Sequence, residues 1–356
     1  MKTNRLIALS IFALSACIAM AQKTITVKSA EQFINAIGPD RTIIIDSKEA
    51  LDITSVLKHY QKIGKVGEAD TYYYEGEEMT RELPDYSDDE YYDEEDAHAL
   101  PTPYEEDEEG DYIGDEGDME EEATEDDIKM RELAGYRPEN LKKENYKAKK
   151  DGKVLEHVFY VQDSDGIGLE IRNCPNLTIK SKKNKAMLLA TPRYVNVVDF
   201  ANCPNLKLEN LILGHTLEGT CSNGVLKVTV CDGVSIDGCD LFGCGTEGFT
   251  FDYSSNVIVT RSNVHDCSYF TLHINGCKSV KFNDCYFYRN KRFRQLNCCE
   301  SSNVTFQGCT FENLKGKLFN LESPCYFEKC KFINCQMEHE NPQNAANAVL
   351  KNCVEM

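Results

Sequence analysis

Several absences limit what this 356-residue chain can be. Beyond residue 21, no stretch approaches the roughly 18 consecutive apolar residues that cross a membrane, so no transmembrane span is expected. The C-terminal half shows no helical periodicity and no L-x-x-L-x-L frame, which argues against helical and leucine-rich repeats. The positive charge is modest and no basic-aromatic platform is evident, so a nucleic-acid partner is not expected.

Metal-binding motifs are also missing. The chain has no loop with EF-hand spacing, so a defined calcium site is not indicated. No C-x-x-C pair is matched by a second such pair, so zinc is unsupported. We therefore expect no metal site and no cofactor, and calcium stays open only as weak, multivalent binding to acidic residues.

What the sequence does contain is a repeat of 21 to 24 residues between Leu226 and Cys335. Apolar residues recur two positions apart, which is the period of a β-strand. Three short strands per repeat are separated by small residues. The columns are clearest at the repeat anchors and two positions after them: Val234, Val257, Val280, Val304 and Cys325, then Ile236, Val259, Phe282, Phe306 and Phe327.

Such a repeat predicts an all-β fold, a right-handed parallel β-helix (a solenoid). One coil cannot bury its own apolar side, so coils stack with equivalent residues about 4.8 Å apart. The columns over residues 155–335 resemble the right-handed β-helix of the pectate-lyase-like class. This resemblance implies an architecture and leaves the chemistry open.

The N-terminus reads as an export signal over residues 1–21, with Lys2 and Arg5 before an apolar core and a small-x-small cleavage site at Ala19-Met20-Ala21. Cys17 offers an alternative, because Leu14-Ser15-Ala16-Cys17 fits the box for lipid attachment to a bacterial cysteine. The expected location is periplasmic, at the cell surface or secreted, and the protein is expected to be a monomer.

Residues 22–60 read as an N-terminal cap followed by the first coil. Ser29 is a candidate helix N-cap with Gln32 at the capping-box position, and Phe33 and Ile34 would face inward. A capping helix has a physical reason here, because the end of a β-helix exposes an apolar core and open sheet edges.

Residues 61–153 are predicted to be an acidic disordered insertion followed by a Lys-rich linker. Residues 68–127 hold 29 Asp and Glu against one Arg, and such a segment cannot bury enough apolar surface to fold. The segment carries a net charge of −28 while the whole chain carries −20, so the remainder is basic, at about +8. It is interpreted as a solubilising insert, with calcium binding or mimicry of an anionic ligand as alternatives. The β-helix then runs over 154–335, and 336–356 is expected to lose the repeat and cap the other end.

The cysteines follow the repeat rather than any metal motif. Sixteen of the 17 lie between Cys174 and Cys353, at recurring positions where Ser replaces Cys in some coils. This pattern favours stacked buried thiols, although an exported protein could also form disulfides, for example through Cys221 or Cys353, and a soft-metal site is a third alternative.

Candidate catalytic and binding residues come from the outward positions of one strand face. Glu247, Asp252 and His273 combine carboxylates with an imidazole, which suits proton abstraction or glycoside cleavage. We treat these three as candidate catalytic residues. A plain solvated strand face is the alternative interpretation. Candidate substrate-binding residues are neighbours in the same coils and one histidine predicted on a long loop: Arg292, Arg294, Asn275, Asn297 and His215.

The catalytic motifs of the pectate-lyase-like class are incomplete in this sequence. Gly214-His215 is followed by Thr216 instead of the second glycine of the polygalacturonase G-H-G turn, and residues 289–294 lack the proline of the pectate-lyase R-x-P-x-x-R run. Two functions remain. The protein either binds or cleaves a polysaccharide or envelope glycan along a lateral groove, as a polysaccharide lyase or glycoside hydrolase if it is an enzyme, or it is a non-catalytic envelope spacer or docking protein.

Overall fold

The computed structural model describes most of the chain outside its N-terminus and its acidic segment. The described residues are 22–66, 72–74, 77–79, 144–163, 166–192, 194–216, 223–243, 247–267, 270–290 and 295–356. The predicted signal peptide with Cys17, most of the acidic insertion, and Arg292 and Arg294 lie outside these residues. Within the described part, no helix is long and apolar enough to cross a membrane.

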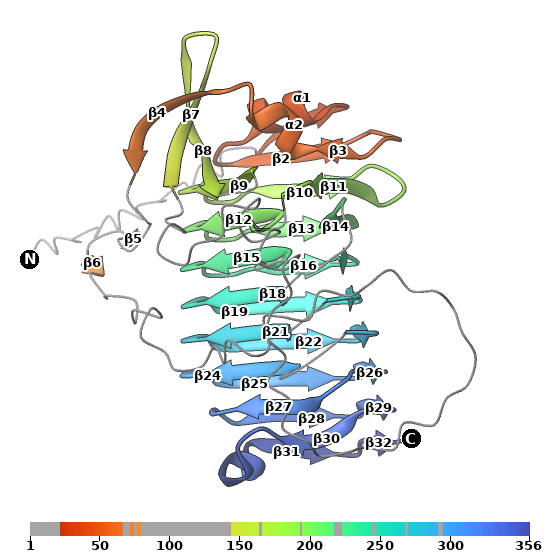
Figure 1. Ribbon diagram of the computed structural model, residues 1–356. Coiled ribbons are helices and arrows are strands. Elements are labelled where there is room, and N and C mark those ends of the chain that lie inside the picture. Colours follow the sequence, from red (N-terminus) through yellow and green to blue (C-terminus); the bar gives the residue numbers. More distant parts are fainter. Residues whose placement is uncertain are drawn as a thin grey trace, which may run out of the picture.

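Three long sheets form the walls of a right-handed parallel β-helix, with successive coils stacked as Figure 1 shows. Sheet A contains β1 (Lys23–Val27), β2 (Arg41–Ile45), β10 (Thr178–Ser181), β13 (Lys207–Glu209), β16 (Ser235–Asp237), β19 (Ser255–Thr260), β22 (Lys278–Asn283), β25 (Ser302–Gln307), β28 (Cys325–Glu328) and β31 (Ala348–Lys351). Sheet B contains β3 (Leu51–Asp52), β11 (Ala186–Ala190), β14 (Leu211–His215), β17 (Asp240–Phe242), β20 (Asn263–His265), β23 (Tyr286–Tyr288), β26 (Thr310–Glu312), β29 (Lys331–Ile333) and β32 (Val354–Glu355). Sheet C contains β4 (Gln61–Val66), β7 (Glu144–Lys150), β8 (Lys153–Asp163), β9 (Gly166–Arg172), β12 (Val198–Ala201), β15 (Leu226–Thr229), β18 (Glu247–Asp252), β21 (Phe270–Asn275), β24 (Leu296–Cys299), β27 (Lys317–Leu321) and β30 (Gln336–His339). A separate hairpin pairs β5 (Tyr72–Tyr74) with β6 (Glu77–Met79).

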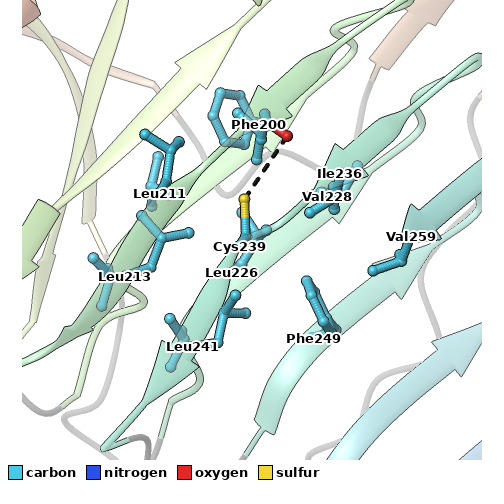
Figure 2. Close-up of a cluster of buried hydrophobic side chains, with 14 of the residues drawn as sticks. Phe200, Leu211, Leu213, Leu226, Val228, Ile236, Cys239, Leu241, Phe249 and Val259 are labelled. Carbon is cyan, nitrogen blue, oxygen red and sulfur yellow. Dashed lines mark hydrogen bonds between the residues drawn. The ribbon is translucent and has the colours of Figure 1, made fainter. Parts of the chain in front are cut away.

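The predicted register is confirmed in the core. Phe282 pairs with Phe306, and Phe306 with Phe327, in adjacent strands of sheet A. Their rings stack at centroid separations of 4.8 and 4.7 Å, and all three are buried. Further up the solenoid the same inward columns are filled mainly by aliphatic side chains, and Figure 2 shows the cluster around Phe200 and Phe249.

The coil turns at its corners through a left-handed residue that is followed by a small side chain. Val230 (φ 51°) precedes Cys231, and Gly238 (φ 63°) precedes Cys239. Asparagine and glycine favour this backbone region, which explains their frequency at the corners.

Cysteine and serine alternate at these corners because either side chain can accept a hydrogen bond from the corner N–H of the neighbouring coil. The N–H of Cys231 donates to Ser254 Oγ (3.1 Å) in the next coil, Ser254 N–H donates to Cys277 Sγ (3.4 Å), and Cys277 N–H donates to Ser301 Oγ (2.9 Å). Each small side chain therefore accepts a buried N–H that would otherwise cost free energy. Most described cysteines are free thiols, as the stacked-thiol interpretation proposed, but Cys267 forms a disulfide.

The N-terminal end is capped as predicted. Helix α1 (Ala30–Ala36) begins at Ser29, whose hydroxyl accepts from Gln32 N–H, while the Gln32 side chain accepts from Lys28 N–H at 2.8 Å. Phe33 and Ile34 are fully buried. A second short helix, α2 (Ile53–Leu57), follows β3.

The insertion is shorter than 61–153. Strands β4 and β7 pair antiparallel with each other, β7 pairs with β8, and β8 joins β9 at the edge of sheet C. Residues 61–66 and 144–153 therefore belong to the folded body, because they extend a sheet whose edge would otherwise be open.

Residues 336–356 do not leave the repeat, contrary to the expectation. Strands β30, β31 and β32 pair in parallel with β27, β28 and β29, and so form one more coil. The interruption that hid this coil is the 3₁₀ helix η4 (Pro342–Asn347), which lies between β30 and β31.

Candidate functional site

The outer face of sheet C gathers most of the described candidate residues. Asp252 lies on β18, His273 and Asn275 on β21, and Asn297 on β24. The strand register places His273 directly beside Asn297, and Asp252 beside Asn275. The predicted adjacency across coils is therefore present.

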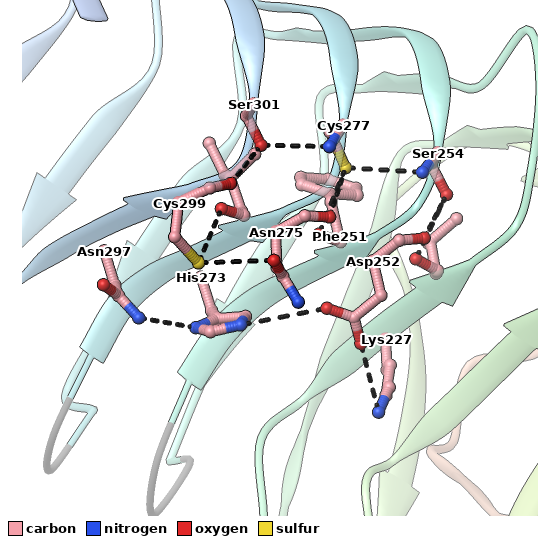
Figure 3. Close-up of polar contacts among 12 residues, drawn as sticks. Lys227, Phe251, Asp252, Ser254, His273, Asn275, Cys277, Asn297, Cys299 and Ser301 are labelled. Carbon is pink, nitrogen blue, oxygen red and sulfur yellow. Dashed lines mark hydrogen bonds and ion pairs between the residues drawn. The ribbon is translucent and has the colours of Figure 1, made fainter. Parts of the chain in front are cut away.

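Five side chains from five successive coils form a continuous chain of polar contacts, which we call the polar ladder: Lys227, Asp252, His273, Asn297 and Asn320 (Figure 3 labels the first four). Lys227 Nζ lies 3.2 Å from Asp252 Oδ2, and His273 Nε2 lies 3.8 Å from Asp252 Oδ1. The Asn297 amide donates to His273 Nδ1 at 2.8 Å, and the Asn320 amide donates to Asn297 Oδ1 at 2.8 Å.

The direction of these hydrogen bonds indicates which tautomer the neutral imidazole of His273 adopts. Because Asn320 donates to the Asn297 carbonyl oxygen, the Asn297 NH₂ group faces His273 Nδ1. In neutral His273, Nδ1 is then an acceptor and Nε2 carries the proton. The side of the ring that faces Asp252 is therefore a hydrogen-bond donor.

Lys227 is the electrostatic partner that sequence reasoning did not include among the candidates. The carboxylate of Asp252 raises the pKa of Lys227 most, burial opposes that rise, and Asp199 and Glu247 add to it. An ammonium surrounded by three carboxylates stays charged. Glu247 thus lies within electrostatic reach of Lys227.

A thiol lies beside the ladder, on the same strand as Asn297. Cys299 Sγ donates to Asn275 Oδ1 at 3.3 Å, and Asn275 is 5% exposed. Burial raises the pKa of Cys299 to about 12. Cys299 is therefore a thiol near neutral pH, as its donation to Asn275 requires.

The upper end of the same face is closed by an ion pair. Arg172 Nε and Nη2 donate to the two carboxylate oxygens of Glu170 at 2.6 and 2.7 Å, and both residues are buried. The Arg172 guanidinium also lies 4.5 Å from the Phe159 ring centroid. The accessible part of the polar face therefore starts below this pair, with the partly exposed Asp199, and continues through Lys227 (side chain 40% exposed) and His273 (20%).

One candidate histidine is placed differently from the expectation, and a further histidine is buried. His215 was predicted on an accessible loop, but it ends β14, is 3% exposed, and its ring nitrogens lie 3.0 and 3.1 Å from the carbonyl oxygens of Val195 and Gly243. The expected accessible loop position of His215 is therefore wrong, because its ring lies buried between two backbone carbonyls. His339, the last residue of β30, is 8% exposed, and neither ring nitrogen has a hydrogen-bond partner among the described residues.

A second cluster, on the outer face of sheet B, was missed. The rings of Phe242, His265 and Tyr288 stack across three coils at 5.8 and 4.7 Å. His265 Nδ1 lies 2.6 Å from Asp266 Oδ2 and Nε2 lies 3.4 Å from Asp240 Oδ1. Burial opposes the charged ring, but the two aspartates outweigh it and raise the pKa of His265. The 23-residue spacing of these aromatic residues was a usable sequence signal.

No metal centre is formed by the described residues, since no group of three or more His, Cys, Asp or Glu side chains there is arranged to hold an ion. The polar ladder supplies one carboxylate and one imidazole, which is fewer ligands than zinc sites use.

Comparison with known proteins defines the class. A family model described as "Right handed beta helix region" matches residues 202–354. Together with the parallel sheets, this match shows that the chain is a right-handed parallel β-helix protein. No curated protein matches the chain. A solved structure of a "putative glycosyl hydrolase" from Parabacteroides merdae is similar over 40% of this chain and 78% of its own, with 16% identity and a TM-score of 0.25. That likeness is too distant to transfer a site.

Proposed function

We propose that this protein is an exported β-helix protein that binds a polysaccharide along the outer face of sheet C, at the polar ladder. The observation that carries the proposal is the ladder itself, in which donors and acceptors from five successive coils form one row. Coils repeat about every 4.8 Å. A row of this kind can hydrogen-bond successive hydroxyl groups of a chain molecule that lies along the solenoid. Export is the part of the proposal that rests on residues 1–21.

The charges near the ladder favour an uncharged glycan. Asp199, Glu247 and Asp252 all act on Lys227, so carboxylates outnumber the ammonium in the described part of this patch. A polyuronate would bring further negative charge into the same region, where like charges repel. Neutral sugar hydroxyls, in contrast, can donate to the carboxylates and accept from Lys227 and from His273 Nε2.

A catalytic form of the proposal assigns proton transfer to His273. This role needs the imidazolium, in which the Asn297 amide is turned so that its oxygen accepts from Nδ1–H; the cation donates its Nε2 proton to the departing glycosidic oxygen and becomes neutral, while the carboxylate of Asp252 stabilises the cation beforehand. With the Asn297 NH₂ group directed at Nδ1, the ring carries only the Nε2 proton and binds sugar hydroxyls without transferring it. Binding without cleavage requires only the same hydrogen-bond donors and acceptors.

The test is a binding screen of the purified protein against neutral and polyuronic glycans, with calorimetry on any ligand found. We expect His273→Ala and Asp252→Asn each to weaken binding at least tenfold, because each removes a group of the ladder. Lys281→Ala is the control on sheet A, where an outward side chain of β22 should not affect binding. The thermal midpoint should change little in all three variants.

One observation favours the alternative of a non-catalytic spacer or docking protein. Several polar atoms of the ladder already satisfy one another, notably the Asn297 amide between His273 and Asn320. If no glycan binds, or if His273→Ala and Lys281→Ala behave alike toward every glycan that does bind, the polar ladder is a structural feature and the docking interpretation takes its place.

A further inference from the structure

The last two described coils each carry a thiol at the same corner. Cys330 and Cys353 occupy the corner that precedes β29 and β32, and the register Lys331 to Val354 places them in adjacent coils. Val354 N–H donates to Cys330 O at 2.9 Å, so the two backbones are held side by side at this point. Both cysteines are free.

The geometry of adjacent coils is compatible with a disulfide. Neighbouring strands lie about 4.8 Å apart, and disulfides join Cα atoms that are about 4.4–6.8 Å apart. Cys330 Sγ donates to the carbonyl oxygen of Phe306 at 3.4 Å and Cys353 Sγ to that of Phe327 at 3.3 Å, and Phe306 pairs with Phe327, so the two thiols occupy equivalent places in adjacent coils. A corner disulfide is also compatible with this fold, because Cys267 is disulfide-bonded at a corner position after β20.

Solvent exposure distinguishes this pair from other cysteines that are neighbours in adjacent coils. Cys203 and Cys231 are both buried, and so are Cys298 and Cys325. Cys353 is partly exposed, while Cys330 lies in the preceding coil and is fully buried. An oxidant can therefore reach Cys353 first, with Cys330 in place to react second.

We propose that Cys353 and Cys330 form an oxidation site that takes a small disulfide as its oxidant and yields a disulfide across the last two coils. The Cys353 thiolate attacks one sulfur of the oxidant, breaks its S–S bond and releases one thiol. The Cys330 thiolate then attacks Cys353 Sγ and releases the second thiol. The two cysteines lose two electrons and two protons, and the oxidant is reduced to two thiols.

The surroundings support the second step. The side-chain interaction with the Cys309 thiol lowers the pKa of Cys330 against the effect of burial, whereas burial raises the pKa of Cys353. A lower pKa increases the thiolate fraction of Cys330 that is available for attack. The product would tie β32 to β29.

The experiment uses the full chain, reduced, freed of reductant and incubated with oxidised glutathione, then alkylated and mapped by mass spectrometry. Digestion after aromatic residues separates Cys330, between Phe327 and Phe332, from Cys335. We expect a cross-linked pair of peptides that contains Cys330 and Cys353. Cys335 is the matched control, because it is also partly exposed but has Leu314 as its neighbour in the coil above, so it should remain free or carry glutathione.

Two variants make the result decisive. In Cys330→Ser, Cys353 should accumulate as the mixed disulfide with glutathione, because the second thiol is missing. This variant is expected to fold, since Ser262 fills the equivalent corner in another coil. Cys335→Ser should leave the cross-link unchanged. Three results with the wild-type protein would overturn the proposal. Cys353 stays reduced while Cys335 reacts, Cys353 stops at the mixed disulfide with glutathione as in Cys330→Ser, or Cys353 forms a disulfide with a cysteine other than Cys330.

Discussion

Truncation of Phe306 tests the stacked core most directly. Its ring lies between Phe282 and Phe327 at 4.8 and 4.7 Å with interplanar angles of 5°, and it is 2% exposed. Replacing a buried phenylalanine by alanine costs about 3–5 kcal/mol. We expect the upper part of this range, because both neighbouring rings are held by their own strands and cannot move far to fill the cavity.

A graded series separates volume from stacking and from charge. Phe306→Leu keeps most of the volume and should cost about 1–1.5 kcal/mol. Phe306→Asp places an unpaired carboxylate in the core, which costs several kcal/mol, so this variant should not fold. Thr305→Ala is the control on the same strand, and because Thr305 points outward its effect should stay within about 0.5 kcal/mol.

The measurement is urea unfolding followed by far-ultraviolet circular dichroism and, in parallel, by tyrosine fluorescence. Two probes are needed because stacked coils can unfold in parts rather than in one step. A Phe306→Ala variant within about 1 kcal/mol of Thr305→Ala would refute the stacked register. So would a soluble Phe306→Asp variant with an unchanged spectrum and thermal midpoint.

Four further predictions address the histidines, a strained corner and the insertion. Burial lowers the pKa of His339, so its stabilising effect is complete above about pH 6.5 and is lost as the pH falls; His339→Phe should remove that loss in thermal midpoints measured from pH 7 to pH 5. His265 has the opposite pH dependence, because its pKa is raised in the folded protein. Its contribution to the free energy of unfolding is complete below about pH 6.5 and is lost as the pH rises through the folded-state pKa. His265→Gln should remove this dependence. Val230→Asn should stabilise the protein by about 1 kcal/mol in urea unfolding, since a β-branched residue is disfavoured at φ 51° and asparagine occupies the equivalent corner at Asn202; unchanged or lower stability would contradict the corner analysis. Replacing residues 67–143 by a two-residue turn should leave the circular dichroism spectrum unchanged, because Val66 already pairs with Asn145, and loss of folding would show that the insertion packs on the body.

The inward residues could be predicted from the sequence because burial imposes a period on them. A column position is either apolar or small in every coil, so the spacing of Val280, Phe282 and their equivalents is enough to identify the register. The last coil was missed although the same signal was present. Ala348, Leu350 and Cys353 each follow their partners in the preceding coil by 23 residues, but η4 interrupts the pattern between them.

The outward residues were only partly predictable, because no common environment constrains them. The strand register places Asp252 beside Asn275 and His273 beside Asn297, and both pairs follow from the repeat spacing. The spacing did not reveal that Lys227 would bind Asp252, since a salt bridge depends on side-chain direction across coils. His215 was misplaced for a related reason: β14 extends to this residue and turns its ring toward backbone carbonyls.

The same division between inward and outward positions explains why function can change on this scaffold without loss of the fold. Inward columns and corners supply the packing and the buried hydrogen bonds, so their substitution alters stability. Outward rows meet solvent or one another, and two of the outer faces differ sharply: sheet C carries the polar ladder, whereas sheet B carries stacked rings around His265. A ligand that needs hydrogen-bond donors and acceptors in a row is therefore matched by sheet C. The stacked rings of sheet B have most of their faces occupied by each other, so they are better suited to stabilise neighbouring coils than to bind a sugar ring.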